Sequence, residues 1–321
     1  MGQLTTRAND ITPEVNQIYT RVLLREGTPT LLYDLFSQMV TVIPNGSGTK
    51  TAAFRRYRNL GAAGVLEEGI TPPGQKAMVD NISATTTPYG DYLSTTDEVL
   101  TQSPDPTFLI YNELLGEQAA LTFNGVARDV LAGGTQVTYQ GGHTARDEVT
   151  ATDVPTAEAF ENIADNLKGR YARKLTSMIV AGGGQGTVSV NPSYVAIVSV
   201  PTGRRVMGLD GFTHAKNYAS VTGLIHPREI GAFDQIRFVE GDETMVFEGA
   251  GASGVDVHGT LIMAREAFGT VALNSESIES ISKGLGSGDD PLNQRATTGW
   301  KGEKTYIILN QDFVQRYEHT V

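Results

Sequence analysis

The longest regular pattern in this sequence is helical and covers residues 105–132. Asp105 is a suitable N-cap, Pro106 fits the first turn, and Gly133 with Gly134 would end the helix. Apolar side chains recur at helical spacing throughout, at Phe108, Leu115, Ala119, Phe123, Val126 and Val130. At 1.5 Å per residue such a helix would be about 40 Å long. A rod of that length suits a framework element better than a lid.

The segment before this helix, residues 39–100, is typical of β-strands. Two extended stretches flank residues 71–74 (Thr-Pro-Pro-Gly), which favour a tight turn. If residues 61–64 also turn, Arg58 would lie opposite Glu67 on a hairpin. The segment has few large apolar residues to bury, and such a hairpin is marginal alone in water. It therefore needs a support, either its own domain or a neighbouring subunit.

The rest of the chain alternates between helical and extended patterns. We expect helices at residues 12–25, 31–36 and 156–174, and a helical turn near residues 227–232. We expect strands at residues 40–43, 51–60, 136–142, 193–200, 236–240, 244–248, 255–263, 269–273, 305–309 and 313–317. The sequence contains no internal repeat and no long linker. This mixture predicts an α+β fold.

Composition excludes several classes of protein. The net charge of −11 argues against a general attraction to nucleic acid or to an anionic membrane. The absence of cysteine excludes disulfides and cysteine-ligated metals. No apolar run approaches the roughly 18 residues that span a bilayer, and the N-terminus lacks the apolar core of a secretory signal. We therefore expect no membrane partner.

No stretch carries a complete catalytic or metal-binding pattern. The glycine-rich residues 181–186 lack the Lys-Ser/Thr pair and the following helix of a phosphate-binding loop. The five histidines have no metal-ligand spacing. The basic run at residues 55–58 can suggest nucleic-acid contact, but a charge-paired strand is favoured because acidic residues 67–68 lie close by in sequence. We expect no cofactor and no enzymatic activity; an active site assembled from distant residues is the alternative.

The only tryptophan, Trp300, lies in the polar stretch DPLNQRATTGWKG, residues 290–302. Three roles are open for it: a ligand site, a loop that closes over a substrate, or a surface that meets another copy of the chain. An indole offers a large apolar area and one N–H donor, which suits an interface. The unsupported hairpin also calls for a partner, and a second copy is the simplest one.

Residues 290–301 resemble a near-C-terminal stretch, DPLNQRAT-GWK, found in one branch of the major capsid proteins of tailed bacteriophages. Other stretches resemble the same branch in the same order, at residues 71–75, 89–92, 115–118, 128–134, 231–240 and 249–257. Each stretch is weak alone, but in register they cover almost the whole chain and are specific. That family is similar in fold to the capsid protein of phage Hong Kong 97.

The resemblance implies a Hong Kong 97-like phage capsid fold. Residues 1–38 would form an N-terminal arm, and residues 39–104 would hold an extended-loop hairpin and a peripheral-domain strand. Residues 105–152 would form the peripheral domain with a long spine helix. Residues 153–265 would form the axial domain, and residues 266–321 would return to the peripheral domain.

The resemblance also implies a function and partners. The chain would be a structural major capsid protein that self-assembles as hexamers and pentamers into the icosahedral shell enclosing double-stranded phage DNA. It would be found in the virion and assembled in the bacterial host cytoplasm. A separate scaffolding protein, a portal protein at one vertex and an optional decoration protein are implied, with DNA enclosed without sequence-specific binding. The interface residues we expect are Arg55, Arg56, Arg58, Glu67, Glu68, Lys76 and Trp300.

Several alternatives stay open under this resemblance. Trp300 would anchor packing either inside the subunit or against a neighbour. A cellular nanocompartment shell protein of the same fold would differ by a groove for its cargo. Another virion part, such as a tail or adhesin protein, usually shows repeats that this sequence lacks. Some relatives crosslink a loop lysine to an asparagine of a neighbour; Lys76 lies in the loop, but no matching stretch supports such a bond and we predict none.

Overall fold

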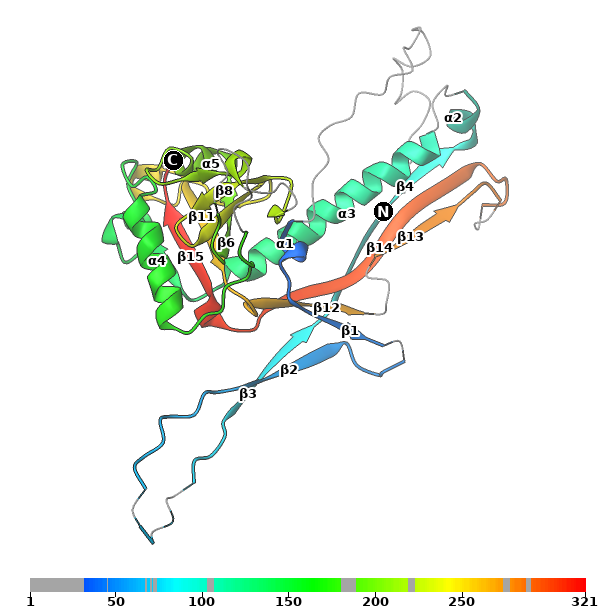
Figure 1. The fold of residues 1–321 in the computed structure, drawn as a ribbon. Coiled ribbons are helices and arrows are strands. Elements are labelled where there is room, and N and C mark those ends of the chain that lie inside the picture. The colour runs from blue at the N-terminus through cyan, green and yellow to red at the C-terminus, as the bar shows by residue number, and fades with distance from the viewer. Residues whose placement is uncertain are drawn as a thin grey trace.

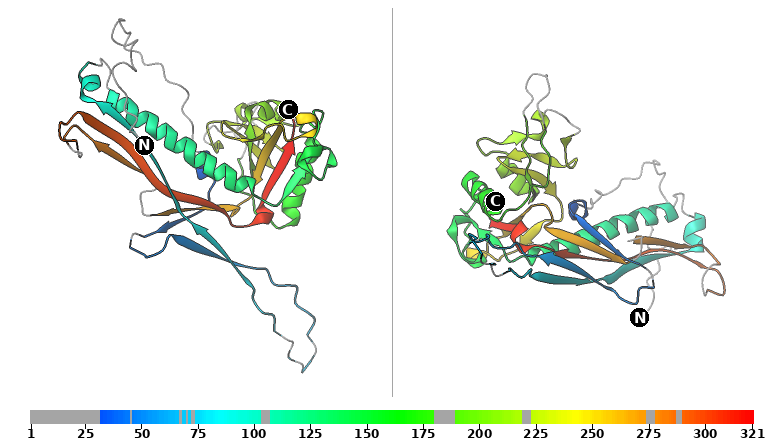
Figure 2. Two further views of the ribbon diagram at one scale, coloured as in Figure 1. Left: turned by 180° about the vertical axis from the view of Figure 1, so that it is seen from behind. Right: turned by 60° about the horizontal axis from the view of Figure 1, so that its bottom comes forward.

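The computed structural model describes residues 32–44, 46–66, 68–69, 71, 74–102, 107–179, 189–218, 223–273, 278–286 and 290–321. It shows two β-sheets that meet near the C-terminal end of one long helix, α3 (Thr107–Ala132). A hairpin leaves the body near the place where the sheets meet and extends into solvent (Figure 1). Figure 2 shows that the second sheet forms a compact lobe, while the first sheet and α3 form an elongated plate.

The first sheet is built on β14 (Arg295–Ile308), the longest strand among the described residues. One edge of β14 pairs with β4 (Thr87–Thr96) in antiparallel register. Its other edge pairs first with β13 (Ile278–Lys283) and then with β12 (Phe268–Leu273), and β1 (Met39–Ile43) adds to β12 in parallel. A short helix, α2 (Asp97–Gln102), follows β4. Because β14 is paired along both edges, it is the backbone of the plate.

The helix α3 lies on one face of the first sheet (Figure 1). Its buried residues recur every four positions, at Leu115, Ala119, Phe123, Ala127 and Leu131. This spacing keeps one stripe of the helix against the sheet. The stripe begins on the first sheet and ends in the core of the lobe, so α3 joins the two units.

The second sheet has the strand order β5-β15-β11-β6-β9-β8-β7 among the described residues, and β10 pairs with β11. The strands are β5 (Val137–Tyr139), β15 (Val314–His319), β11 (Val257–Met263), β6 (Tyr194–Ser199), β9 (Ile236–Gly241), β8 (Glu229–Phe233), β7 (Thr213–His214) and β10 (Met245–Phe247). All of β6 is buried, because both faces of the sheet are covered. The last strand of the chain, β15, lies inside this sheet between β5 and β11, and not beside β14.

Helices cover the two faces of the second sheet. On one face α4 (Ala157–Gly169) buries Phe160, Ile163 and Leu167 against the sheet. The side chain of Thr156 caps α4 by accepting a hydrogen bond from the amide of Ala159 at 3.4 Å. Another helix, α5 (Val200–Val206), follows β6 directly and begins at its N-cap, Ser199.

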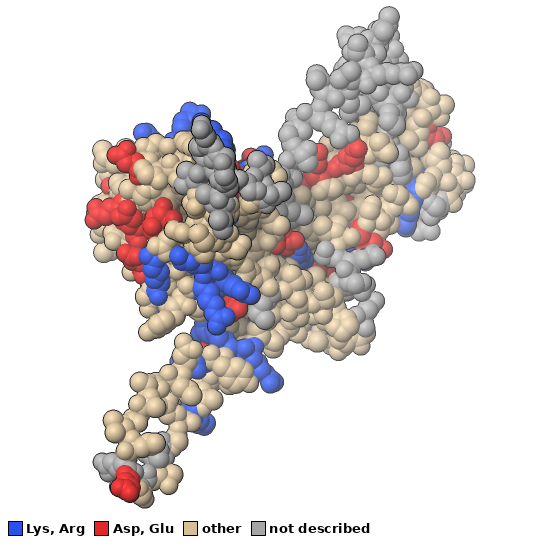
Figure 3. Space-filling view, viewed as in Figure 1, with Lys and Arg blue, Asp and Glu red and all other residues tan. Residues whose placement is uncertain are grey.

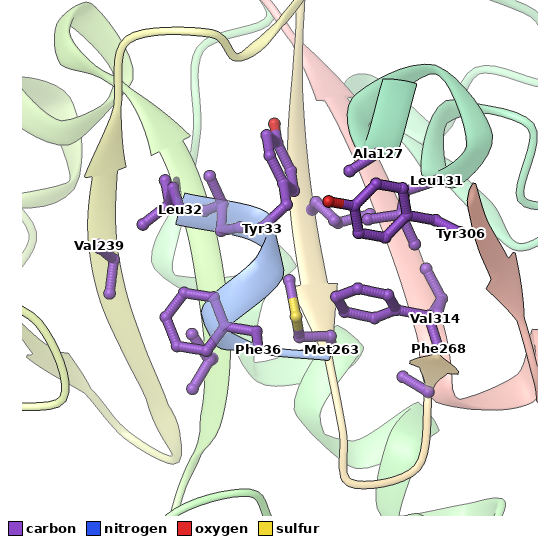
Figure 4. Packing of buried hydrophobic residues seen from close by; sticks show 14 of the residues in the cluster. Leu32, Tyr33, Phe36, Ala127, Leu131, Val239, Met263, Phe268, Tyr306 and Val314 are labelled. Carbon is purple, nitrogen blue, oxygen red and sulfur yellow. The ribbon is translucent and has the colours of Figure 1, made fainter. Parts of the chain in front are cut away.

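The opposite face of the second sheet carries the core that joins both units. The short helix α1 (Leu32–Leu35) directs Leu32, Tyr33 and Phe36 onto this face (Figure 4). The same core contains Leu131 of α3 and Tyr306 of β14. Residues from both sheets and from the start of the described chain therefore share one continuous core, which fixes the lobe to the plate.

The hairpin consists of β2 (Thr51–Tyr57) and β3 (Val79–Thr85), paired from Thr51 opposite Thr85 to Tyr57 opposite Val79. Its root packs on the first sheet through Ala52 and Ala84. The described residues between the two strands form no helix and no strand, and they turn at residues 68–69. The distal half of the hairpin therefore has no layer of its own to pack on.

Much of the predicted secondary structure is confirmed. The long helix, the helices near residues 31–36 and 156–174, and nearly all the predicted strands are present. The prediction of a helix at residues 12–25, the glycine-rich residues 181–186, and the capping residues Asp105 and Pro106 lie outside the described residues.

Other predictions are wrong. Residues 229–233 form strand β8 and not a helical turn, because they pair with β9 on one side and β7 on the other. The helix α4 ends at Gly169, five residues earlier than predicted, and Tyr171 takes a left-handed conformation with φ of 58°. Residues 61–64 do not turn. The amide of Arg58 bonds to the carbonyl of Met78 at 3.0 Å, so Arg58 lies opposite Met78 and not opposite Glu67.

Candidate assembly surfaces

The distal hairpin exposes large apolar side chains that the described part of the subunit does not cover. Val65 is 97% exposed and Leu66 is 70% exposed. The other members of this apolar set are Tyr57, Leu60, Met78 and Val79. Glu68 lies in the turn at the tip and is exposed. Exposed apolar side chains gathered on one projecting element are typical of a surface that meets another protein.

Charged residues link the two strands of the hairpin at the distal end of their pairing. Asp80 accepts hydrogen bonds from Arg58 at 2.8 Å and from Arg56 at 2.9 Å. The two guanidinium groups lower the pKa of Asp80 to about 2. Arg56 also donates to Asn310 at 2.8 Å, which ties the hairpin to the segment between β14 and β15. Strand pairing and this charged cluster together set the direction in which the hairpin projects.

The predicted interface residues are divided among different surroundings. Arg56 and Arg58 share Asp80, whereas Arg55 is exposed on β2. Lys76 and Glu68 are exposed on the distal hairpin, and Glu67 lies outside the described residues. The remaining residue of the set, Trp300, is far from the hairpin tip.

Trp300 lies in strand β14 and not in a loop that closes over a substrate, which was one of the three roles left open. Its side chain is 6% exposed and packs at the interface between α3 and the first sheet. The ring meets Phe123 edge-on with centroids 5.8 Å apart, and the indole N–H donates to Gln118 at 3.0 Å. The packing supports the alternative in which the indole acts inside the subunit.

Buried charges stabilise the lobe and were missed in the sequence. Arg237 and Glu229 are almost fully buried and form two hydrogen bonds, at 2.5 Å and 2.7 Å. The hydroxyl of Tyr218 and the amide of Ile225 also donate to the carboxylate of Glu229, at 2.9 Å and 2.8 Å. Burial raises the pKa of Tyr218, and the neighbouring Glu229 adds to the effect. All of these groups lie within residues 218–237, but none of their spacings is a recognised charge-pair pattern, so the sequence analysis did not find them.

A second buried cluster fixes the C-terminal strand. The carboxylate of Glu318 accepts from Arg146 at 2.7 Å and 2.8 Å, and from Arg316 at 2.7 Å. The guanidinium of Arg146 lies 3.4 Å from the ring centroid of Phe247. Glu318 is fully buried, and the two arginines supply the hydrogen-bonding partners that a buried carboxylate needs.

The structure brings two of the scattered histidines together. His258 and His319 are opposite each other on β11 and β15, with ring centroids 6.4 Å apart. Within the described ranges, no three His, Asp or Glu side chains gather where they could hold a metal ion. Also within those ranges, no helix is long and apolar enough to cross a membrane.

Comparison with solved structures identifies the fold. The capsid of Ralstonia phage GP4 aligns with a TM-score of 0.71 at 12% identity, over 100% of this chain and 98% of that chain. This chain has a phage capsid fold. The capsid of cyanophage P-SCSP1u aligns with a TM-score of 0.66 at 13% identity, over 97% and 94%. The capsid of cyanophage Pam1 aligns with a TM-score of 0.64 at 12% identity, over 100% and 99%.

The phage capsid fold confirms the Hong Kong 97-like architecture that the resemblance implied, at the level of the fold. No family model matches the sequence, and no curated protein matches it. The assignment to the branch with the DPLNQRAT-GWK stretch stays a prediction. The alignments cover both partners almost end to end.

Proposed function

We propose that this chain is the major capsid protein of a tailed bacteriophage. Copies of it self-assemble as hexamers and pentamers into the icosahedral shell that encloses double-stranded DNA. The observation that carries the proposal is the distal hairpin, whose apolar side chains have no support in the described part of their own subunit. A chain of phage capsid fold with such a projection is suited to cover a neighbour.

The two units correspond to distinct roles in this proposal. The first sheet, with α3 as the spine helix, is the peripheral domain, and the hairpin is its extended loop. The second sheet, with α4 and α5, is the axial domain near the symmetry axes. Residues 266–321 then serve both domains, because β12 to β14 belong to the first sheet and β15 to the second. Residues 1–38 form the N-terminal arm.

The role is structural and not enzymatic in this proposal, and the protein is located in the virion. The net charge of −11 suits a shell that encloses DNA without gripping it. A separate scaffolding protein directs assembly in the host cytoplasm, a portal protein occupies one vertex, and a decoration protein is an optional outer partner. Each subunit contact is modest, so wrongly placed subunits dissociate before the shell closes.

The proposal is tested by light scattering of the purified protein over a concentration series, followed by negative-stain microscopy. We expect closed shells, or rings of five or six subunits, alone or after co-expression with a scaffolding protein. Persistent monomers under both conditions would refute the proposal.

A matched pair of variants then tests the role of the hairpin. Val65→Ser with Leu66→Ser removes apolar surface from the tip, and each side chain is worth about 1.5–3 kcal/mol when it is fully buried in a contact. We expect this variant to need a higher concentration to assemble. The control is Leu292→Ser, which removes an exposed apolar side chain outside the hairpin and leaves assembly unchanged. Equal behaviour of the two variants would contradict the role given to the tip.

A further inference from the structure

A large groove lies between the hairpin and the lobe. Its volume is about 1070 Å³, and it is bounded by β2, by the segment after α4, by the turn between β11 and β12, and by residues 309–313. Six arginines line it: Arg55, Arg56, Arg58, Arg170, Arg173 and Arg265. Figure 3 shows that basic side chains gather on the surface where the hairpin leaves the body. A groove of this volume is large enough for a ligand of several rings and phosphates.

The groove has an excess of positive charge, although the whole chain has a net charge of −11. Two carboxylates line it beside the arginines, those of Glu266 and Asp312. A third carboxylate, that of Asp80, is shared by two of the six arginines. Positive charges therefore exceed negative ones by three, so this groove attracts anions where most of the surface repels them.

Exposed arginines stand on both walls of the groove. Arg55 lies on the hairpin wall, and Arg173 and Arg265 lie side by side on the lobe wall, where the amide of Arg265 donates to the carbonyl of Arg173 at 2.9 Å. Arg55 and Arg173 have no carboxylate partner among the described residues, and Arg265 is 4.0 Å from Glu266 in a solvent-exposed contact of little strength. An anion between the walls would meet cations from both.

The two walls carry similar sequences, each with a tyrosine among arginines. Residues 55–58 are Arg-Arg-Tyr-Arg, and residues 170–173 are Arg-Tyr-Ala-Arg. Tyr57 is 67% exposed and Tyr171 is 83% exposed, and both line the groove. Proteins bind single-stranded nucleic acid with this combination, because aromatic rings stack on bases while basic groups hold the backbone. An acidic peptide would use the arginines but has no base to stack on the rings.

Tyr171 occupies a position that ordinarily favours glycine. Its amide donates to the carbonyl of Lys168 at 2.9 Å, and the amide of Ala172 donates to the carbonyl of Leu167 at 3.0 Å. These two bonds end α4 in a Schellman motif, with Tyr171 in the left-handed conformation at φ of 58°. A bulky residue in this conformation is uncommon, and glycine adopts it without steric cost. Since the ring packs in no core, a role in binding accounts for a tyrosine at this position.

We propose that the groove binds a short stretch of single-stranded nucleic acid, with phosphates on Arg55, Arg173 and Arg265 and bases stacked on Tyr57 and Tyr171. These contacts reach phosphates and base faces, so the binding does not depend on base sequence. The inference goes beyond the proposed function and does not rest on it. It is compatible with an acidic shell, because the negative charge elsewhere confines the nucleic acid to the groove.

The binding is measured by fluorescence anisotropy on the unassembled protein, with a fluorescein-labelled oligothymidylate of about ten nucleotides. We expect the logarithm of the binding constant to fall with the logarithm of the salt concentration with a slope of about −2, the value for three phosphate contacts on a single strand. We expect an annealed duplex of the same length to bind more weakly, because its bases are stacked on each other and cannot reach the tyrosines. Oligouridylate should also bind; a preference for either strand would support the inference and identify DNA or RNA as the ligand.

A pair of arginine substitutions tests the phosphate contacts. Arg55 and Arg173 are exposed, so Arg55→Gln with Arg173→Gln leaves the fold intact, which the thermal midpoint verifies. At about 50 mM salt we expect the affinity to fall by at least about tenfold and the salt slope to change to about −0.7, because one phosphate contact remains. The matched control, Arg204→Gln with Arg205→Gln, removes two exposed arginines of α5 and leaves both quantities unchanged. Equal behaviour of the two variants would overturn the inference.

Tyr171→Gly separates binding from stability. Glycine suits the left-handed backbone, so we expect the thermal midpoint to rise. Loss of the stacked ring should weaken binding by at least about fivefold without altering the salt slope. Tyr171→Phe keeps the ring and should keep the affinity. A glycine variant that binds as tightly as the native chain would show that the ring stacks on no base, and the inference would be overturned.

The remaining outcomes are also decisive. The inference is overturned if the oligothymidylate shows no saturable binding at about 50 mM salt, or if the duplex binds as tightly as the single strand. A labelled polyglutamate peptide that binds as tightly as the oligothymidylate would assign the groove to an acidic protein segment instead. None of these results bears on the formation of rings or shells, which scattering and microscopy measure separately, so either proposal can fail alone.

Discussion

The stability of the lobe should fall between pH 7.5 and pH 5 because of one buried histidine, His319. It is the last residue of β15, opposite His258 of β11, and its side chain is fully buried. Its Nδ1–H donates to the carbonyl of Thr320 at 2.9 Å, and its Nε2 accepts from the hydroxyl of Thr260 at 3.0 Å. Burial, with a smaller contribution from the neighbouring His258, lowers the pKa of His319 from 6.5 to about 4, although the hydrogen bond to Thr320 acts in the opposite direction. The neutral ring is therefore the form that fits the fold.

The direction of the effect follows from these two pKa values. Between pH 6.5 and pH 4 the unfolded chain binds a proton at His319 that the folded chain does not, so acid favours unfolding. At pH 5 this linkage amounts to a loss of about 2 kcal/mol relative to pH 7.5. Burial also lowers the pKa of His258 and of His226, which adds to the loss in the same direction. The contribution of His319 is therefore measured by comparing the native chain with a variant that lacks this histidine.

The assay is urea unfolding of the unassembled protein at pH 7.5 and pH 5, followed by far-ultraviolet circular dichroism. Tryptophan fluorescence is unsuitable, because Trp300 reports on the first sheet. We expect His319→Gln to lose about 2 kcal/mol less than the native chain on acidification. The control His214→Gln replaces a histidine that is only partly buried and should match the native chain. The reasoning is refuted if His319→Gln and the native chain lose the same free energy.

Three other predictions have defined outcomes. Trp300→Ala should cost about 3–5 kcal/mol of unfolding free energy by urea titration, whereas Trp300→Phe should cost far less; equal costs would contradict the packing role. Arg237→Met should cost about 3–5 kcal/mol, because Glu229 stays buried without its partner, and adding Glu229→Leu should recover most of the loss. Asp80→Asn should speed hydrogen exchange in β2 and β3 without lowering the thermal midpoint of the whole protein; unchanged exchange would show that Asp80 does not hold the hairpin.

The sequence predicted those elements whose pattern is local. The helix α3 was recognisable because its apolar residues keep helical spacing and glycines follow its end. The buried strand β6 was recognisable as a short apolar run. The strand order of the second sheet was not predictable, because pairing such as β15 between β5 and β11 joins segments far apart in the chain.

The sequence was misleading where contacts with distant segments of the chain, and not the local residues, decide the structure. The stretch around Trp300 resembled a loop because it is polar, yet Thr298 is buried and bonds to Asn112 of α3. Gly299 lies so close to β4 that an added Cβ would be 2.7 Å from the Cβ of Tyr92. The glycine in this case allows close strand packing and does not mark a turn. The groove lined by Arg55, Arg173 and Arg265 was likewise unpredictable, because these residues come from distant segments.

Polar and apolar groups would play different roles in the contacts between subunits. Inside the lobe, the buried ions are paired with each other, as in Arg237 with Glu229, and add nothing to a neighbour. On the hairpin, the apolar side chains are exposed, so their burial would supply most of the driving force and would be insensitive to salt. Added salt should then change the stability of the contacts made by the hairpin only little.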